Sequence, residues 1–133
     1  MLKGRVAFAI GVVAAAFALV LGFSSAPASA RTMQFQEVVI VGTSPAAVTA
    51  GQTYTISFQL MRGDDARHIA GVGCYAIAGG RRAQLVDQGT DGTVGHCTWT
   101  IPRRAAGLTF DGIISAQADS GTWWNRGFDL PVS

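Results

Sequence analysis

The sequence predicts an all-β fold, a single Greek-key β-sandwich of about seven strands. Apolar and polar residues alternate with a period of two through most of the chain after residue 30, which is typical of strands with one face in a core and one in water. Gly, Pro and Asp turn signals bound these stretches at regular spacing. The 103 residues of 31–133 are enough to bury one core and too few for two. A small closed barrel is the alternative architecture.

Residues 1–30 have the pattern of a secretory signal peptide. Two early cations precede an almost wholly apolar run at 6–23, and Ala28-Ser29-Ala30 is the small-residue motif that signal peptidase cleaves. An uncleaved membrane anchor is the alternative, because 18 apolar residues just reach the length that spans a bilayer. We expect the mature protein to be residues 31–133, to be secreted or periplasmic, and to meet a membrane only through the signal peptide before cleavage.

Removal of the leader changes the charge balance. The whole chain has a formal net charge of +2, but Lys3 and Arg5 both lie in the leader. Residues 31–133 contain eight Arg, eight Asp or Glu and no Lys, so their formal charge is zero. Nucleic-acid binding needs clustered cations that displace counterions, so we expect no nucleic-acid partner. The composition, rich in Arg, Ala and Gly, suggests a bacterial origin.

Seven stretches satisfy the strand pattern, because each alternates or is a short apolar run and each ends at a turn signal. The clearest is the second, where Tyr54, Ile56 and Phe58 share one face and hydroxyl residues lie between them. The first ends at the turn residues 42–45, and 46–48 is a candidate continuation that switches sheets. The expected strands are 35–41, 53–60, 70–78, 81–86, 96–101, 108–118 and 122–132.

Turn chemistry predicts the connections between these strands. Residues 61–68 are expected to form a polar loop, Gly79-Gly80 a tight turn, and 87–92 a turn that ends in the strong signal Asp91-Gly92. Arg81-Arg82 opens the fourth stretch and suggests an edge strand, since charged residues discourage edge-to-edge pairing. A hairpin at 119–121 joins the last two strands.

The two cysteines, Cys74 and Cys97, are expected to form one disulfide, as is usual in an exported chain. Cys97 shares a strand face with Trp99 and Ile101, so an interior crosslink fits the pattern. Closing a loop of 23 residues stabilises a fold by about 3 kcal/mol in the chain-entropy account. Free thiols or a zinc site are the alternatives, although neither cysteine belongs to a CxxC and the spacing fits no zinc finger. We expect no metal and no cofactor.

Several motifs resemble secreted bacterial immunoglobulin-like and fibronectin-like modules. Residues 48–58 fit their second-strand pattern, a Val, then Gly, then an aromatic residue followed by alternating apolar residues. Cys97 to Pro102, then Gly107, Gly112 and Arg126-Gly127-Phe128, look like the end of such a domain. The resemblance implies an immunoglobulin-like sandwich and transfers no site residues. It departs from antibody domains, because the cysteines fall on the third and fifth expected strands and not on the second and sixth.

Trp123-Trp124 is the strongest signal for binding. Adjacent strand residues face opposite sides, and parity with Phe128 sends Trp124 inward and Trp123 outward, unless Gly127 sits in a bulge. An outward Trp123 can stack on a sugar ring or anchor a protein partner. The alternative is that it covers a neighbouring strand. Arg126, the second candidate binding residue, shares the parity of Trp124. It is expected at the mouth of the sandwich, and a bulge in the strand is the alternative.

No catalytic constellation is evident, so we expect the protein not to be an enzyme. His96 directly precedes Cys97 and on a strand points away from its sulfur. No Gly-x-Ser-x-Gly elbow occurs, and Glu37 is the only glutamate. Arg62-Gly63-Asp64 spells an integrin-type tripeptide, but it has ordinary turn composition. The scattered Asp residues could supply calcium oxygens, yet no EF-hand spacing is present.

These observations predict a secreted, non-catalytic binding or structural β-sandwich with a protein or carbohydrate ligand. The alternative is a small-molecule carrier or inhibitor resembling the secreted antibiotic-binding apoproteins. That resemblance implies a ligand held in a cleft between sheet and loops. Such proteins usually have two disulfides, whereas this chain allows one.

Overall fold

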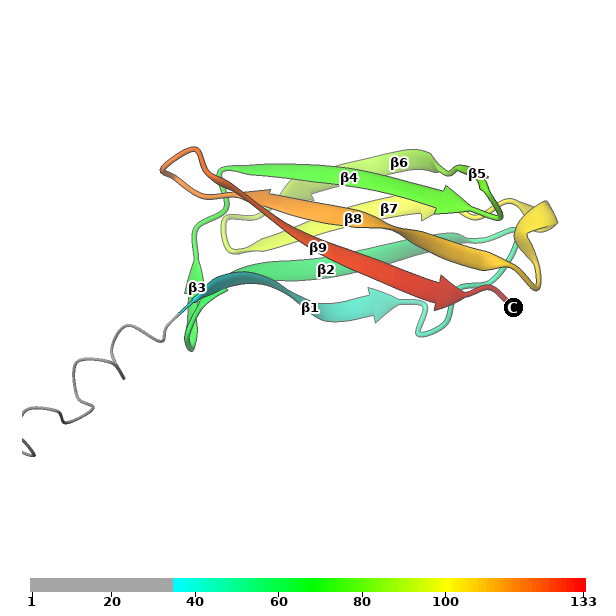
Figure 1. The fold of residues 1–133 in the computed structure, drawn as a ribbon, viewed down its shortest axis with the longest axis horizontal. Helices are drawn as coiled ribbons and strands as arrows, with labels where there is room; N and C mark the ends of the chain where they lie inside the picture. The colour runs from blue at the N-terminus through cyan, green and yellow to red at the C-terminus, as the bar shows by residue number, and fades with distance from the viewer. Residues whose placement is uncertain (1–34) are drawn as a thin grey trace, which may run out of the picture. The chain divides into compact units, whose positions relative to one another are not determined.

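The computed structural model describes residues 35–133, so the expected signal peptide and its cleavage site lie outside the described residues. Within residues 35–133 the chain forms two antiparallel β-sheets and no α-helix (Figure 1). The predicted all-β class and its sandwich-like pair of sheets are confirmed. The elements are β1 (Gln36–Ser44), β2 (Thr53–Arg62), β3 (Asp65–Arg67), β4 (Gly71–Ala78), β5 (Arg81–Arg82), β6 (Gln84–Thr90), β7 (Val94–Thr100), the 3₁₀ turn η1 (Arg103–Ala105), β8 (Thr109–Gln117) and β9 (Trp123–Pro131).

The five-stranded sheet has the order β1-β2-β7-β6, with the short β3 paired to β2, and the four-stranded sheet has the order β5-β4-β8-β9. The chain changes sheet after β1, because Val48 forms a parallel bridge with Val132, which follows β9. The expected continuation at 46–48 therefore does reach the other sheet. Among residues 35–133, no helix is long and apolar enough to cross a membrane.

Aromatic rings from both sheets meet in the core. Tyr54 of β2 and Trp99 of β7 contact Phe110 of β8 edge-on, with ring centroids 5.8 and 5.3 Å apart. Phe128 of β9 packs on Phe110 at 5.2 Å. Contacts of this kind are worth about 0.5–1.5 kcal/mol each beyond the area that they bury. The alternation of apolar residues in β2 and β7 therefore supplies one half of the core, as predicted.

The disulfide Cys74–Cys97 joins the two sheets. Cys74 lies on β4 and Cys97 on β7, with their Cα atoms 5.9 Å apart. Cys97 is fully buried, and so are Trp99 and Ile101 beyond it. The predicted crosslink and the core-facing parity of this strand are both confirmed.

The expected fourth strand and the turn after it are placed differently. Arg81 and Arg82 pair with β4, whereas β6 belongs to the other sheet and pairs with β7 as far as Thr90. The turn therefore covers only 91–93 and not 87–92. Sequence missed this because β6 is an edge strand with mostly exposed side chains, so its hydrogen bonds to β7 leave no hydrophobic pattern.

Two other predictions of irregular structure were wrong. The polar stretch 61–68 contains a hairpin, because β3 folds back on the end of β2 through a turn at Gly63 and Asp64. The first strand also does not stop before Gly42. A register shift between Ile40 and Gly42 absorbs one residue, and β1 then continues to Ser44.

Candidate functional site

The outer face of the four-stranded sheet carries Trp123, the predicted binding residue. Ala76, Ile114 and Ala116 are buried, so the residues that alternate with them along β4 and β8 face outward. Because glycine, aromatic and aliphatic residues dominate its centre, we call this surface the aromatic face. It comprises Gly71, Gly73, Tyr75 and Ile77 of β4, Arg82 of β5, Asp111, Ile113, Ser115 and Gln117 of β8, and Trp123, Asn125, Gly127 and Asp129 of β9.

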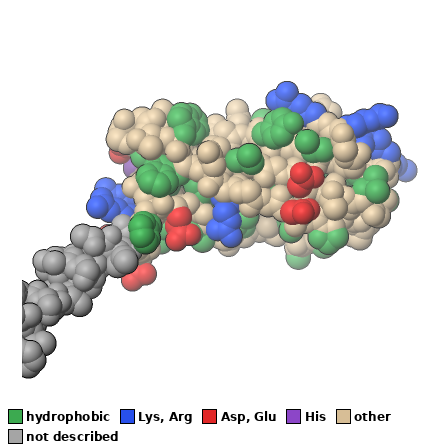
Figure 2. Space-filling model, viewed as in Figure 1, with side chains coloured by type: hydrophobic (Ala, Val, Ile, Leu, Met, Phe, Trp, Pro, Cys, Tyr) green, Lys and Arg blue, Asp and Glu red, His purple; other side chains and the backbone are tan. Residues whose placement is uncertain are grey.

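Three large apolar side chains on this face remain close to half exposed. The exposed fractions are 44% for Tyr75, 46% for Ile113 and 47% for Trp123. Tyr75 and Ile113 are direct cross-strand partners, and Gly127 lies next to Ile113 on β9. In the space-filling view of Figure 2, hydrophobic side chains lie among acidic and basic ones on one face of the molecule. Exposed apolar side chains that gather on one face of a sheet are typical of a contact surface.

Trp123 crosses its own sheet. A Cβ atom placed on Gly71 would lie 3.3 Å from Cη2 of the indole, and one on Gly73 would lie 3.7 Å from Cζ3. Both glycines belong to β4, and β8 runs between β4 and β9, so the ring spans β8. The outward orientation predicted from parity is therefore present. The alternative also holds in part, since one side of the ring covers β4 while the rest is open to solvent.

Charged groups lie at one end of the aromatic face. The Arg82 guanidinium sits 5.2 Å from the centre of the Tyr75 ring, a cation–π contact. Asp111 and Asp129 are direct cross-strand partners in the same row of the sheet as Ile77, which pairs with Arg82. Like charges directly opposite each other are unfavourable in a sheet. This end of the face therefore carries an acidic pair at one side and an arginine at the other.

Arg126 and Trp124 lie away from this face. The Arg126 Nη1 donates a hydrogen bond of 3.2 Å to the carbonyl of Val38, so it links β9 to β1 at the open edge between the sheets. That position matches the expected mouth of the sandwich. Trp124 packs against the core, and its Nε1 has no hydrogen-bond partner within the described residues. The structure therefore does not bring the two candidate binding residues, Trp123 and Arg126, together.

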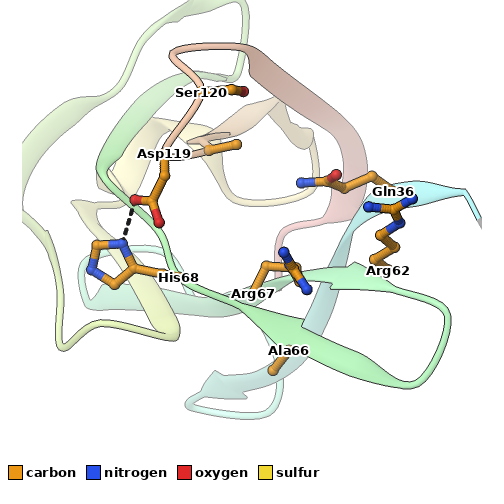
Figure 3. Close-up of a pocket in the computed structure, with 8 residues that line it drawn as sticks. Gln36, Arg62, Ala66, Arg67, His68, Asp119 and Ser120 are labelled. Atoms are coloured by element: carbon orange, nitrogen blue, oxygen red, sulfur yellow. Dashed lines mark hydrogen bonds and ion pairs between the residues drawn. The ribbon is translucent and has the colours of Figure 1, made fainter.

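A concave surface, the end pocket, lies between the β2–β3 and β8–β9 hairpins and measures about 390 Å³ (Figure 3). Arg62 and Arg67 turn their guanidinium groups toward it. His68 Nδ1 donates to Asp119 Oδ1 at 2.6 Å on one side. No carboxylate of the described residues lies within 4.0 Å of either guanidinium. The pocket therefore offers two cations without an ion-pair partner among these residues.

The other predicted groups behave as structural residues. His96 points away from the cysteines and donates through Nε2 to Asp87 Oδ2 at 3.0 Å. The backbone N–H groups of Val94 and Thr93 donate to Asp91 Oδ1 at 2.9 and 3.3 Å. These two bonds hold the pKa of Asp91 below its ordinary value. In residues 35–133, no three His, Cys, Asp or Glu side chains come together as metal ligands would.

Comparison of the chain with family models, curated proteins and solved structures found no match. The candidate site therefore depends on geometry. No binding role was predicted from the sequence for Tyr75, Ile113 or Arg82. The pair Ile113-Ile114 could have indicated an outward apolar residue on this strand, as Trp123-Trp124 does on the last one. Adjacent apolar residues mark a strand that is apolar on both faces.

Proposed function

We propose that this protein is a secreted or periplasmic, non-catalytic binding module, and that it binds through the aromatic face. The observation that carries the proposal is the presence of three half-exposed apolar side chains, Tyr75, Ile113 and Trp123, on the outer face of one sheet. Trp and Tyr are enriched at the buried centres of interfaces, where they supply much of the binding energy. A ring already fixed over β4 loses little conformational entropy when a partner covers it.

An immunoglobulin-like fold is part of this proposal, and the strand order supports it. When the two short strands β3 and β5 are left out and the others are lettered A to G along the chain, the sheets become A-B-E-D and C-F-G. That is the arrangement of immunoglobulin constant-type domains, which have Greek-key connections. The disulfide differs, because it joins the positions of strands C and E, whereas antibody domains join B and F.

Export is supported by two independent features. The first 30 residues have the charge, the apolar run and the small-residue ending of a cleavable leader. The described domain contains a disulfide, a bond that persists in oxidising compartments and is rare in the cytosol.

A binding role rather than catalysis is supported by the contacts of the two histidines. His68 pairs with Asp119, but the neighbouring Ser120 hydroxyl donates to Thr122 and not to the imidazole. His96 pairs with Asp87 on the outer face of the five-stranded sheet. A nucleophile within reach of the base, which covalent catalysis requires, is not part of either arrangement.

The test is to compare oxidative labelling of side chains in two preparations of the wild-type protein. In one, the protein remains in the native exported fraction; in the other, it is purified and highly dilute. We expect Trp123 and Tyr75 to be labelled several-fold less in the native fraction. Val86 is the internal control, because it is 48% exposed but lies on β6 of the other sheet. Equal labelling of Trp123 in both preparations would refute binding through the aromatic face.

The end pocket supports a second candidate function, that of a small-molecule carrier. Its size falls within the range of about 300–1,000 Å³ that is usual for ligand sites. Arg62 and Arg67 are suited to a carboxylate- or phosphate-bearing molecule, because guanidinium groups bind such anions through paired hydrogen bonds. Titration calorimetry with inorganic phosphate and with a tricarboxylate would test it, with Arg62→Gln as the variant and Arg103→Gln as the control. Equal heats for the two variants would refute this second function.

A further inference from the structure

The aromatic face is complementary to itself, and we infer that its partner is a second copy of the same chain. The two copies would pack face to face about a two-fold axis that runs parallel to the strands, between β4 and β8. This inference rests on the proposed function, because it assigns a partner to the same surface. Its support comes from three rows of the sheet, each of which finds its complement in the symmetry-related row.

The first row is charged. It runs from Arg82 on β5, through Ile77, to Asp111 and Asp129 on β8 and β9. The proposed axis exchanges β5 with β9 and β4 with β8, so Arg82 of each copy faces Asp129 of the other. Each guanidinium would then lie against a pair of carboxylates that repel one another in the single chain. Complementary charges of this kind fix register and exclude other partners.

The second row is apolar, and a side chain that projects from one copy fits a depression in the other. Tyr75 projects from β4, and the axis places it over Ile113 of the other copy. Beside Ile113, Gly127 has no side chain, and it helps to line a shallow depression of about 440 Å³. The ring of Tyr75 from one copy can enter the depression of the other, and the reverse contact follows from symmetry.

The third row contains the indole of Trp123. Because this ring spans β8 and reaches Gly71 and Gly73, it lies close to the proposed axis, and the two indoles would meet. Packed sheets lie about 10 Å apart. Two rings, each resting on its own sheet and touching the other, give three layers of contact at about 3.5 Å each, which matches that spacing.

The area of the face sets the expected strength. Three strands at about 4.8 Å spacing with eight residues at about 3.3 Å each, together with the two residues of β5, cover about 400 Å² in plan. Standard interfaces bury about 800 Å² per partner, so this dimer should be weak, with a Kd in the micromolar range or above. It would form where the exported protein is locally concentrated and dissociate on dilution.

The test is sedimentation velocity on the exported protein, expressed with its leader, over concentrations from about 1 µM to about 1 mM. Arg82→Asp and Asp129→Arg are each expected to raise the dimer Kd at least about tenfold, since each creates like-charge contacts across the interface. The double variant Arg82→Asp/Asp129→Arg restores opposite charges and should return the Kd to within about threefold of wild type. Arg81→Asp, the adjacent exposed arginine outside the aromatic face, is the matched control and should not change it. Circular dichroism of each variant is used to check that it is folded.

The outcomes separate this inference from the proposed function. A concentration-dependent dimer with rescue by the double variant supports it. A protein that stays monomeric up to the highest concentration, while Trp123 is still protected from labelling in the native exported fraction, overturns the dimer and retains the binding face for another ligand, such as a glycan. A dimer whose Kd is the same in wild type and in both single charge variants also overturns it, because the contact would then use another surface. A monomer without protection of Trp123 overturns both proposals.

Discussion

The outer faces of the two sheets differ in the contacts that their side chains make. On the five-stranded sheet, Thr55 and Thr98 share a hydrogen bond of 2.7 Å across β2 and β7, and His96 binds Asp87 across β7 and β6. On the four-stranded sheet the corresponding positions are held by Tyr75, Ile113 and Trp123, which remain close to half exposed. Both faces lie over the same core. The outer face of the five-stranded sheet therefore has two polar cross-strand pairs, whereas the aromatic face has one, Ser115 with Asn125, beside three uncovered apolar side chains.

This contrast separates two properties that alternation alone does not distinguish. A period of two predicts which side chains point away from the core, but it does not predict whether those side chains are polar and solvated or apolar and open to a partner. Polar cross-strand pairs are more numerous on one face here, whereas glycine and half-exposed apolar residues leave the other suited to a partner. The proposed function and the proposed dimer both depend on this difference, and the changes below test it.

The largest expected effect comes from removing the crosslink that holds the two faces over one core. Cys74→Ala combined with Cys97→Ala should lower the free energy of unfolding by about 3 kcal/mol, because the unfolded chain regains the freedom of the open loop. Urea denaturation of the oxidised wild type and the double variant measures the difference. Reduced wild type is the control and should resemble the variant. A change below about 1 kcal/mol would mean that packing alone holds the sheets together.

The next effect tests the polar face. Thr98→Val leaves the hydroxyl of Thr55 without its partner and should cost about 1 kcal/mol of stability. The double variant Thr55→Val/Thr98→Val removes both groups and should recover part of that loss, since a matched apolar pair has no unsatisfied atom. Urea denaturation of the three variants gives the coupling energy. An additive double variant would show that this hydrogen bond contributes nothing to the outer face.

Sequence and structure agree where a property depends on one strand. Parity along β9 gave the outward Trp123, and parity along β7 gave the buried Cys97. The aromatic face as a unit was not predicted, because it depends on the register between β4 and β8, and three other strands lie between these two along the chain. The same limit applies to the end pocket, whose arginines meet the β8–β9 hairpin only in the folded domain.

The second half of β6, residues 87–90, was predicted as a turn for a different reason. An edge strand with solvent on most of its side chains is held by backbone hydrogen bonds, which any sequence can supply. Its Asp, Gln, Gly and Thr residues therefore resembled a turn. The true turn begins at Asp91, where side-chain oxygen accepts two backbone N–H groups, and this local chemistry is what sequence can indicate.

A smaller effect on stability is expected from substituting the β4 glycines that the Trp123 ring covers. In Gly71→Ala the new Cβ would lie 2.8 Å from Gln117 Oε1 and 3.3 Å from Trp123 Cη2, so both the Gln117 side chain and the indole ring should shift away from β4. In the control Gly73→Ala the distance to the ring is 3.7 Å, an ordinary contact. We expect stability to change by less than about 1 kcal/mol in both. Acrylamide quenching of tryptophan fluorescence should increase only for Gly71→Ala. Equal quenching of the two variants would show that the ring does not rest on Gly71.

The smallest effect is the acid dependence of the turn between β6 and β7. The hydrogen bonds from Val94 and Thr93 favour the Asp91 carboxylate, so the pKa of Asp91 in the folded protein lies below its ordinary value of 3.8. Unfolded chains therefore bind this proton more readily. The contribution of Asp91 to stability is present above the unfolded pKa and is lost as the pH falls through the folded pKa.

Asp91→Asn retains the accepting oxygen but does not titrate, so its free energy of unfolding should fall less steeply than that of wild type below about pH 4. Urea denaturation between about pH 3 and pH 7 measures the slope. Asp64→Asn, at an exposed carboxyl whose side chain makes no hydrogen bond within residues 35–133, is the control and should follow wild type. Parallel curves for wild type and Asp91→Asn would mean that the turn gains nothing from the charge. Since Asp91 lies in the turn between β6 and β7, away from the four-stranded sheet, this acid dependence should leave the labelling of Trp123 on the aromatic face unchanged.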